Sequence, residues 1–479
     1  MSLQKTIPSN VKTSSDDVVD AVVARVVLPD VDYLTGWRFA AVGIAIVLSI
    51  AQNSMTLIVG RAITGLGVAG TFGGSYIIIG VSVPPEKRPA MTGLMGSAYA
   101  IASVIGPLIG GALTDRVTWR WCFYINLPCG ALAAASIVLF FRVPDAIKPT
   151  EATIKEKLLQ MDIPGFLFVT AAVVCYLLAM QWGGPLKIWS SSSVIGTLVG
   201  CVVVFIAFLA IKWYQGERAL LLPNIMKNRT IVRGSAFSFL IAGNFYILLY
   251  YLPIYFQAVR GTDATESGIR TLPLILGLTL VQIIKGISVG ATKLFNPFVL
   301  LGGALTTIAS ALMTKLQPDS PSTVWIGYQA LAGVGLGLCF NVYIIIAQNI
   351  VKLNEVATAT AILLFFQSLG GALVVSAAQA LFQNELINTL PITNPTLNAA
   401  SIFSIGASEI QKSLSKEELP GINASYMKGL HMAFALACPT ASAATFVAGW
   451  QKWFRFKTPS DAPEGAGEAQ GENGEEKMH

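Results

Sequence analysis

Long apolar runs separated by short polar turns extend along most of this chain. About 20 apolar residues are enough for a helix to cross the hydrocarbon core of a bilayer. Twelve runs approach or exceed this length, with approximate limits 38–55, 57–82, 89–112, 121–141, 162–182, 189–211, 234–258, 267–284, 296–316, 323–349, 357–382 and 429–450. The pattern predicts an all-α polytopic membrane protein with about twelve transmembrane helices.

Composition supports this fold class and excludes several functions. Hydrophobic residues make up 54% of the chain and charged residues only 12%, with a mean hydropathy of +0.63, whereas soluble domains carry about 25% charged residues. The two histidines, His431 and His479, cannot form a histidine metal centre, and no phosphate-binding P-loop motif occurs. We therefore expect no enzyme, no metal and no cofactor. The net charge of +6 lies mostly in loops and requires no nucleic-acid partner.

Lysine and arginine are unevenly distributed between the two sets of loops. The loops after even-numbered runs, with the residues just past the last run, carry nearly twice as many as the opposite loops. Because cytoplasmic loops carry the excess of positive charge, both termini are predicted to be cytoplasmic. The polar segment 383–428 is then an outer loop, and Asn423 in its Asn-Ala-Ser sequon is a candidate glycosylation site.

A glycine-rich region contains the charge that is hardest to place. Arg61 is the one charged residue of the run 57–82. Arginine at bilayer depth costs at least about 2.5 to 3.5 kcal/mol, so it usually faces a partner or a wet cavity. Arg61 is therefore a candidate for charge or proton coupling, and a structural ion pair or a clamp on backbone carbonyls is the alternative.

The glycines themselves suggest close helix packing, because small residues let helix backbones approach in lipid. A proline among them can kink a helix and act as a hinge between moving bundles. The candidate packing and hinge residues are Gly65, Gly96, Gly106, Pro107, Gly110 and Gly111.

Polar uncharged side chains recur within the later runs. Most such residues form interhelical hydrogen bonds, but as a set they could line a large amphipathic cavity for bulky, uncharged or aromatic molecules. The cavity candidates are Asn244, Tyr250, Asn341 and Gln367. Lys285, just past run 267–284, is expected to snorkel to the cytoplasmic face.

Four segments resemble the major facilitator superfamily, in its fungal branch of fourteen-spanner drug:proton antiporters. Segment 61–70 resembles the arginine-containing motif of the fourth helix. Residues 96–111 resemble the antiporter motif of the fifth helix, G-x-x-x-G-P-x-x-G-G, with Ala102 at its first glycine. The sequence WRWCFYINLP at 119–128 and SGIRTLP at 267–273 are typical of the fungal branch. The resemblance covers about 37–450.

The resemblance also implies a domain organisation. Residues 1–36 form a cytoplasmic tail, 37–141 the remnant of an amino-terminal bundle, and 142–233 a linker with two inserted helices. Residues 234–450 form a carboxy-terminal six-helix bundle with the outer loop 383–428, and 451–479 a disordered acidic tail. Run 38–55 matches the third helix of the family, so the two leading spanners are expected to be absent, through a truncated reading frame or in an impaired product.

The family fold places the substrate between two bundles near the midplane. The resemblance implies a monomeric secondary transporter in the lipid bilayer that exports a small organic molecule, such as a secondary metabolite, toxin or drug, by proton antiport. The plasma membrane is the expected location and the vacuolar membrane the alternative. An importer of iron chelates or nutrients, and a non-transporting receptor or scaffold, remain alternative functions.

Overall fold

The computed structural model describes residues 54–118, 120–140, 162–215, 223–395, 410–415 and 417–451. The amino-terminal tail, nearly all of the apolar run 38–55 and nearly all of the acidic tail lie outside these residues. Every described element is helical apart from one isolated bridge between Gly183 and Lys187. The prediction of an all-α fold is confirmed.

The chain divides into two compact units, and helix α3 (Ser54–Ser82) contributes to both. The first unit comprises 1–70 and 117–143. Besides the start of α3 it contains α5 (Trp121–Tyr124) and α6 (Asn126–Phe140). Run 121–141 is therefore split after Tyr124, and Asn126 donates from Nδ2 to the carbonyl of Cys122 across the break, at 3.0 Å.

The second unit comprises 71–116 and 144–479. Its long helices are α4 (Arg88–Arg116), α8 (Ile163–Trp182), α9 (Ser192–Gln215), α11 (Arg229–Ile254), α13 (Leu272–Thr292), α14 (Asn296–Met313), α15 (Ser322–Cys339), α16 (Val342–Ile350), α17 (Val356–Thr393) and α20 (Leu419–Gly449). Short elements join them: α10 (Pro223–Met226), the π-helix η3 (Tyr255–Val259), α12 (Ala264–Arg270), the 3₁₀-helix η4 (Leu353–Glu355) and α19 (Ile410–Ser413).

Polar side chains define where several of these helices begin. Asp162 caps α8 by accepting from the amide of Gly165 at 3.0 Å, and Asn228 caps α11 by accepting from Thr230 at 3.0 Å. Asp263 caps α12 in the same way. Such caps satisfy backbone donors that a helix terminus leaves free.

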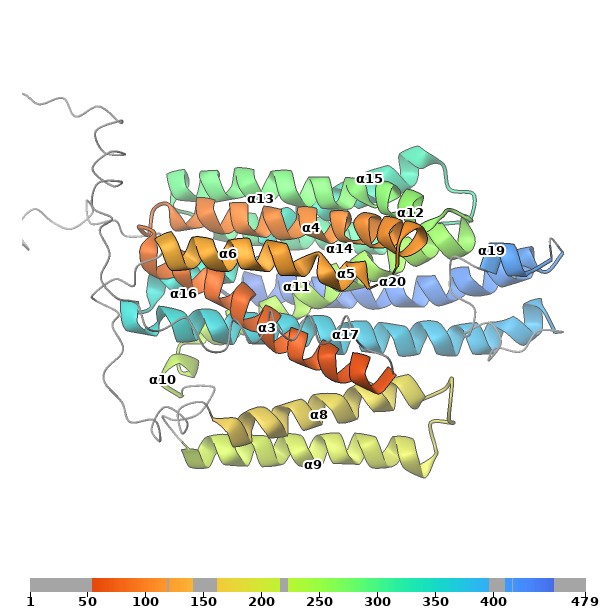
Figure 1. The fold of residues 1–479 in the computed structure, drawn as a ribbon, viewed down its shortest axis with the longest axis horizontal. Coiled ribbons are helices and arrows are strands. Elements are labelled where there is room, and N and C mark those ends of the chain that lie inside the picture. Colours follow the sequence, from red (N-terminus) through yellow and green to blue (C-terminus); the bar gives the residue numbers. More distant parts are fainter. Residues whose placement is uncertain are drawn as a thin grey trace, which may run out of the picture. The chain divides into compact units, whose positions relative to one another are not determined.

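Within the second unit, α11, α17 and α20 pack against one another, and α14 joins them through α20 (Figure 1). Helix α15 lies between α14 and α13, and α4 packs along α13. The inserted pair α8–α9 contacts α17, where Trp189 Nε1 donates to Asn384 Oδ1 at 3.1 Å. The core is rich in large apolar side chains such as Phe237, Phe245 and Phe434.

Nine of the predicted runs are confirmed as helices long and apolar enough to cross a membrane, among the residues described. Helix α4 covers the third run but is less apolar. The helices over runs 357–382 and 429–450 are longer than the runs themselves, because α17 continues to Thr393 and α20 begins at Leu419. The segment between these two helices is therefore 394–418 and not 383–428.

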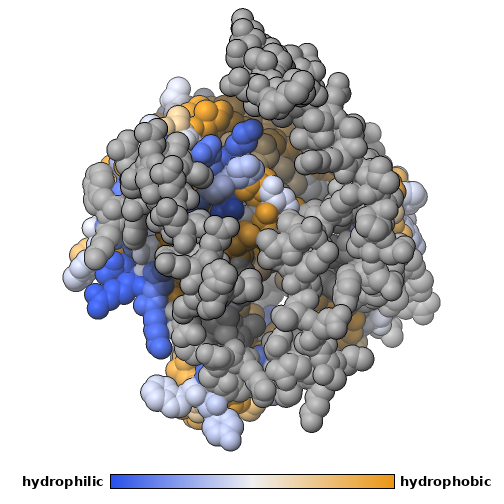
Figure 2. All heavy atoms as spheres, turned by 90° about the vertical axis from the view of Figure 1, so that its left-hand side faces the viewer, coloured by the Kyte–Doolittle hydropathy of each residue, from blue (hydrophilic) through white to orange (hydrophobic). Residues whose placement is uncertain are grey.

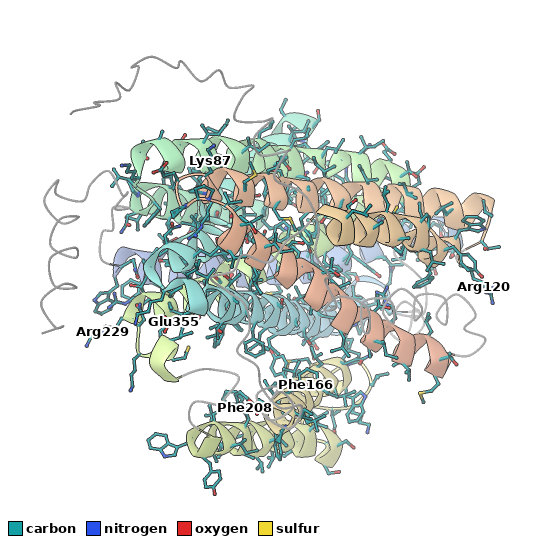
Figure 3. All side chains as sticks on the ribbon, turned by 60° about the vertical axis from the view of Figure 1, so that its left-hand side comes forward. Lys87, Arg120, Phe166, Phe208, Arg229 and Glu355 are labelled. Atoms are coloured by element: carbon teal, nitrogen blue, oxygen red, sulfur yellow. The ribbon has the colours of Figure 1, made fainter. Side chains whose placement is uncertain are left out.

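The carboxy-terminal ends of α3, α9, α13 and α16 lie at one end of the second unit (Figure 1). Lys87, Arg229 and Glu355 lie at this end (Figure 3). Figure 2 looks onto it, and hydrophilic side chains are in view there beside hydrophobic ones. These helices cover even-numbered runs, and the loops after such runs are the ones predicted to be cytoplasmic. We call this end of the second unit the basic end, and its cytoplasmic location stays a prediction.

Candidate functional site

Helices α4 and α13 cross closely because glycines line their contact. A Cβ atom on Gly93 would lie 2.8 Å from the carbonyl oxygen of Gln282, and one on Gly286 would lie 2.7 Å from the carbonyl oxygen of Pro89. A Cβ on Gly96 would meet the amide end of the Gln282 side chain. Gly96 therefore lies in a close helix crossing of the kind predicted.

The other glycines of the predicted motif occupy different surroundings. At Gly65 and Gly106, a Cβ atom added to the backbone would have no atom of another described helix within 4 Å. Pro107, Gly110 and Gly111 lie inside α4, which continues past the proline to Arg116. Of this set, Gly96 is thus brought to a close contact with Gln282, while the hinge role stays a prediction.

Arg61 lies on the part of α3 that belongs to the first unit, and its side chain is exposed. No hydrogen bond or ion pair of its guanidinium occurs among the residues that the structure describes. The described part of the chain therefore supplies no partner for this charge.

A buried polar cluster lies where the membrane-spanning segment of α15 and α16 is interrupted. Asn341 separates the two helices in the left-handed conformation, with φ 62° and ψ 4°. Its Nδ2 donates to the Tyr76 hydroxyl at 3.0 Å, and its Oδ1 accepts from Gln367 Nε2 at 3.2 Å. All three side chains are buried. Two of the four predicted cavity residues, Asn341 and Gln367, are brought together with Tyr76 of α3.

Tyr76 was not among the predicted residues. It is the single phenol of the glycine-rich run 57–82, and this isolation among apolar neighbours is the signal that could have identified it. A second phenol pair lies nearby on α4 and α11, where the hydroxyls of Tyr99 and Tyr246 are 2.9 Å apart. The ring of Phe72 connects the two groups, because its centroid is 5.2 Å from those of both Tyr76 and Tyr99.

Further hydrogen bonds join α3, α4 and α16 at the basic end, next to this cluster. Gln348 on α16 donates from Nε2 to the Tyr76 carbonyl at 3.0 Å. The guanidinium of Arg88 donates to the Gln348 carbonyl at 2.5 Å and to the Val83 carbonyl at 2.9 Å. The ends of α3 and α4 are thus tied to α16, and Gly80 allows the close approach, since a Cβ there would lie 2.8 Å from Val356.

The other two predicted cavity residues lie elsewhere. Asn244 donates to Ser310 Oγ at 2.8 Å and to the Ala437 carbonyl at 2.7 Å, which ties α11 to α14 and α20. Tyr250 is 58% exposed on α11. Asn244 is therefore an interhelical packing contact, the alternative that its sequence context left open.

Asn423 lies in the first turns of α20 and not in a loop. Its Oδ1 accepts from Gln411 Nε2 at 3.2 Å, and the hydroxyl of Ser425 in the same sequon lies 2.7 Å from that of Thr393. Ser425 is fully buried. Because glycosylated sequons lie on the surface, this geometry does not favour modification of the folded chain.

The snorkelling interpretation of Lys285 is wrong. Helix α13 continues to Thr292, two turns beyond the lysine. The side chain is 1% exposed, and Nζ donates to the Phe340 carbonyl at 2.7 Å. A charge at the end of an apolar run suggests a helix end, but α13 continues past Lys285, and its next turn is also partly buried.

The cluster consists of amides, phenols and aromatic rings. No group of three or more histidine, cysteine or acidic side chains able to hold a metal ion occurs in the described ranges. Amide and hydroxyl groups can orient a neutral polar ligand, and aromatic rings can pack against it. The arrangement suits reversible binding of such a ligand between α3 and the helices α16 and α17.

Comparison with known proteins agrees with this architecture. The Major Facilitator Superfamily profile matches residues 33–375. The MFS-type transporter GME11371 of Pestalotiopsis microspora is 45% identical over 416 residues, which cover 86% of this chain and 76% of that protein. The MFS-type transporter thnB of Trichoderma harzianum is 43% identical over 393 residues, covering 82% and 68%.

The efflux pump roqT of Penicillium rubens is 40% identical over 427 residues, which cover 89% of this chain and 79% of that protein. The matches extend over both the glycine-rich amino-terminal helices and the carboxy-terminal bundle. This chain therefore belongs to the Major Facilitator Superfamily, and it is a multi-pass membrane protein and secondary transporter that exports small molecules, not an enzyme.

Proposed function

We propose that this transporter exports bulky, uncharged or aromatic organic molecules in exchange for protons, and that Tyr76, Asn341 and Gln367 form part of its substrate site. The observation that carries this proposal is the hydrogen-bonded chain of these three side chains. It connects α3 to α16 and α17, and so joins a helix of the amino-terminal group to the carboxy-terminal bundle.

The chemistry of the cluster supports the substrate class. Its members carry no formal charge, so they offer hydrogen bonds without selecting an ion. The phenols of Tyr99 and Tyr246 and the ring of Phe72 supply aromatic surface beside it. A drug-sized metabolite or xenobiotic with a few polar groups matches such a lining.

Alternating access explains why the same residues hold the helices together here. In the described conformation Asn341 and Gln348 bond to Tyr76, and Arg88 bonds to Gln348; we interpret this conformation as the one in which the basic end is closed. We propose that substrate enters when these bonds are broken by rocking of α3 and α4 away from α16. The basic end then faces the cytoplasm, and the protein acts as a monomer, in the plasma membrane.

Arg61 is proposed as a fixed charge in the coupling of protons to export. An arginine stays protonated under all physiological conditions, so it can influence a titratable group but cannot carry the proton. Its exposure on α3 supports a role toward a partner beyond its own helix.

The substrate site can be tested with an uncharged fluorescent aromatic probe, Nile red, in cells that lack their own efflux pumps. We expect Asn341→Leu and Gln367→Leu to raise the probe concentration needed for half-maximal efflux about tenfold, because losing a buried hydrogen-bond partner costs about 1–3 kcal/mol. Asn349→Leu is the matched control, since among the described residues its amide donates within its own helix, to the carbonyl of Ile345 at 2.7 Å.

Efflux that stops when a protonophore collapses the pH gradient would support antiport. Unchanged concentration dependence in both cluster variants would refute the assigned site. Efflux that persists without a gradient would refute the coupling.

A further inference from the structure

Lys285 is a buried basic residue for which the transport site has no evident need. Its side chain is 1% exposed in the middle of α13. The carbonyl of Phe340 is its hydrogen-bond partner in the described part of the chain, and neither described ion pair involves it. A charged group at such a depth is costly and usually functional.

The helices around α13 offer little to neutralise a charge on the Lys285 amine. Helix α15 faces Lys285 with the thiol of Cys339, which is fully buried. Helix α4 carries Arg88, whose guanidinium bonds to the carbonyls of Val83 and Gln348. Helix α12 carries the Glu266–Arg270 pair, which is partly exposed and precedes α13 at its far end. Among the described residues, no carboxylate faces the amine.

Buried polar atoms without hydrogen-bond partners lie along α13 next to the Lys285 amine. Thr279, Gln282 and Lys285 follow one another at intervals of three residues, so they lie along one side of the helix. Thr279 Oγ1 and both polar side-chain atoms of Gln282 are buried without hydrogen-bond partners, as is Thr92 Oγ1 on the adjacent α4. Such atoms are the partners that water needs to enter a protein interior.

Lys285 is also connected to the contact that closes the basic end. Its acceptor, the Phe340 carbonyl, belongs to the residue before Asn341. Asn341 in turn holds Tyr76 of α3 at 3.0 Å. A movement of the amine away from Phe340 therefore acts on the interruption between α15 and α16 and on the bond to α3.

We propose that Lys285 is the group that binds and releases the transported proton. The inference rests on the proposed antiport. In this proposal the amine, which is shielded from water in the closed conformation, is neutral before the proton arrives. A proton that reaches Nζ through the Thr279–Gln282 side forms an N–H bond with the amine lone pair, and the resulting charge favours a conformation in which Nζ is hydrated.

That conformation requires α4 to move from α13 and α3 to move from α16, which opens the basic end. Nζ then returns its proton to cytoplasmic water, and the neutral amine can be buried again. By linkage, whichever conformation hydrates the amine binds the proton more tightly, so acid shifts the population toward opening.

The test uses spin labels at two exposed positions of the basic end, Lys87→Cys and Lys352→Cys, in full-length protein in lipid nanodiscs. The other cysteines are changed to alanine except the fully buried Cys339. Label separations are measured by pulsed electron resonance in mildly alkaline and mildly acidic buffer. We expect acid to shift the distribution toward longer separations.

Two substitutions at Lys285 separate protonation from packing. Lys285→Met, uncharged and similar in length, should keep the short separation in both buffers. Lys285→Arg keeps a charge that cannot be released, so it should give the long separation in both. The control Lys315→Met, at an exposed position before α15, should respond to acid like the parent protein.

A parent protein that does not respond to acid, or a Lys285→Met variant that responds like the parent, would overturn the inference. If Lys285→Arg does not fold, the methionine variant still decides. Transport in reconstituted vesicles under an imposed pH gradient tests antiport separately. An acid response of the labels without gradient-driven transport would refute the antiport, and with it the assignment of Lys285 to a transported proton, and would leave Lys285 as a proton-sensitive switch.

Discussion

Three glycines of α4 should respond differently to the same small substitution, because the structure gives each a different neighbour. Alanine is favoured over glycine in a helix interior by about 1 kcal/mol. Gly106 has open space at its Cβ position, so Gly106→Ala should gain about that amount. At Gly93 the new carbon would lie 2.8 Å from the Gln282 carbonyl oxygen, a backbone atom that cannot swing away.

Overpacking of this kind costs about 1–3 kcal/mol. After the propensity gain, Gly93→Ala should be destabilised by up to about 2 kcal/mol. Gly96→Ala should be nearly neutral, because the Gln282 amide that it meets is the end of a flexible side chain without hydrogen-bond partners.

Thermal unfolding in detergent, followed by the fraction of protein that stays monodisperse after heating, measures this order. We expect Gly106→Ala to be the most stable, Gly96→Ala intermediate and Gly93→Ala the least stable. A Gly93→Ala protein as stable as Gly106→Ala would show that α4 and α13 do not cross as closely as described. The same measurement on Gly286→Ala is an independent check from the opposite helix, since its Cβ would lie 2.7 Å from Pro89.

Two further predictions concern Arg61 and Asn423. Arg61→Lys keeps the charge but loses the planar five-donor fork, so we expect gradient-driven efflux from loaded vesicles to fall several-fold while probe binding is unchanged; a normal gradient response of Arg61→Ala would remove Arg61 from the coupling. For Asn423, whose sequon lies in α20 with Ser425 buried, endoglycosidase treatment should leave electrophoretic mobility unchanged, as should Asn423→Gln; a mobility shift that the substitution abolishes would show that this segment is modified on the outer side.

The helical fold was predictable because the bilayer imposes one strong rule on sequence. A spanning helix must bond its own backbone and present apolar side chains to lipid, so nine runs could be located from apolar content alone. Helix ends were less predictable. Helix α17 continues through Glu385 to Thr393 and α20 begins ten residues before its apolar run, because polar residues near a helix end are tolerated where they meet each other or solvent.

The site was predictable only in part, for a reason that lies in tertiary contact. Asn341 and Gln367 share a type with Asn244, and nothing local distinguishes an amide in a packed bundle from one that faces α3. The difference is the partner: Ser310 and Ala437 for Asn244, Tyr76 for Asn341. Lys285 was misplaced because a charge at the end of an apolar run resembles a helix end, and only packing against α15 shows that it is buried.

The glycine crossing of α4 and α13 and the buried Lys285 belong to one interface, and the closeness of the crossing decides what protonation of the lysine can do. Gly286 follows Lys285 directly, and Gly93 and Gly96 of α4 meet Gln282 one turn earlier. A loosely packed crossing could hydrate the amine without moving any helix, and a proton would then have no mechanical effect. Because α4 and α13 touch at backbone distance here, a proton can pass along the Thr279 and Gln282 side chains, but the several waters that hydrate an ammonium can gather around Nζ from this side only if the helices separate. We infer that the close glycine contact is what would convert protonation of Lys285 into movement of α4, so a variant that loosens this crossing should uncouple the acid response before it abolishes folding.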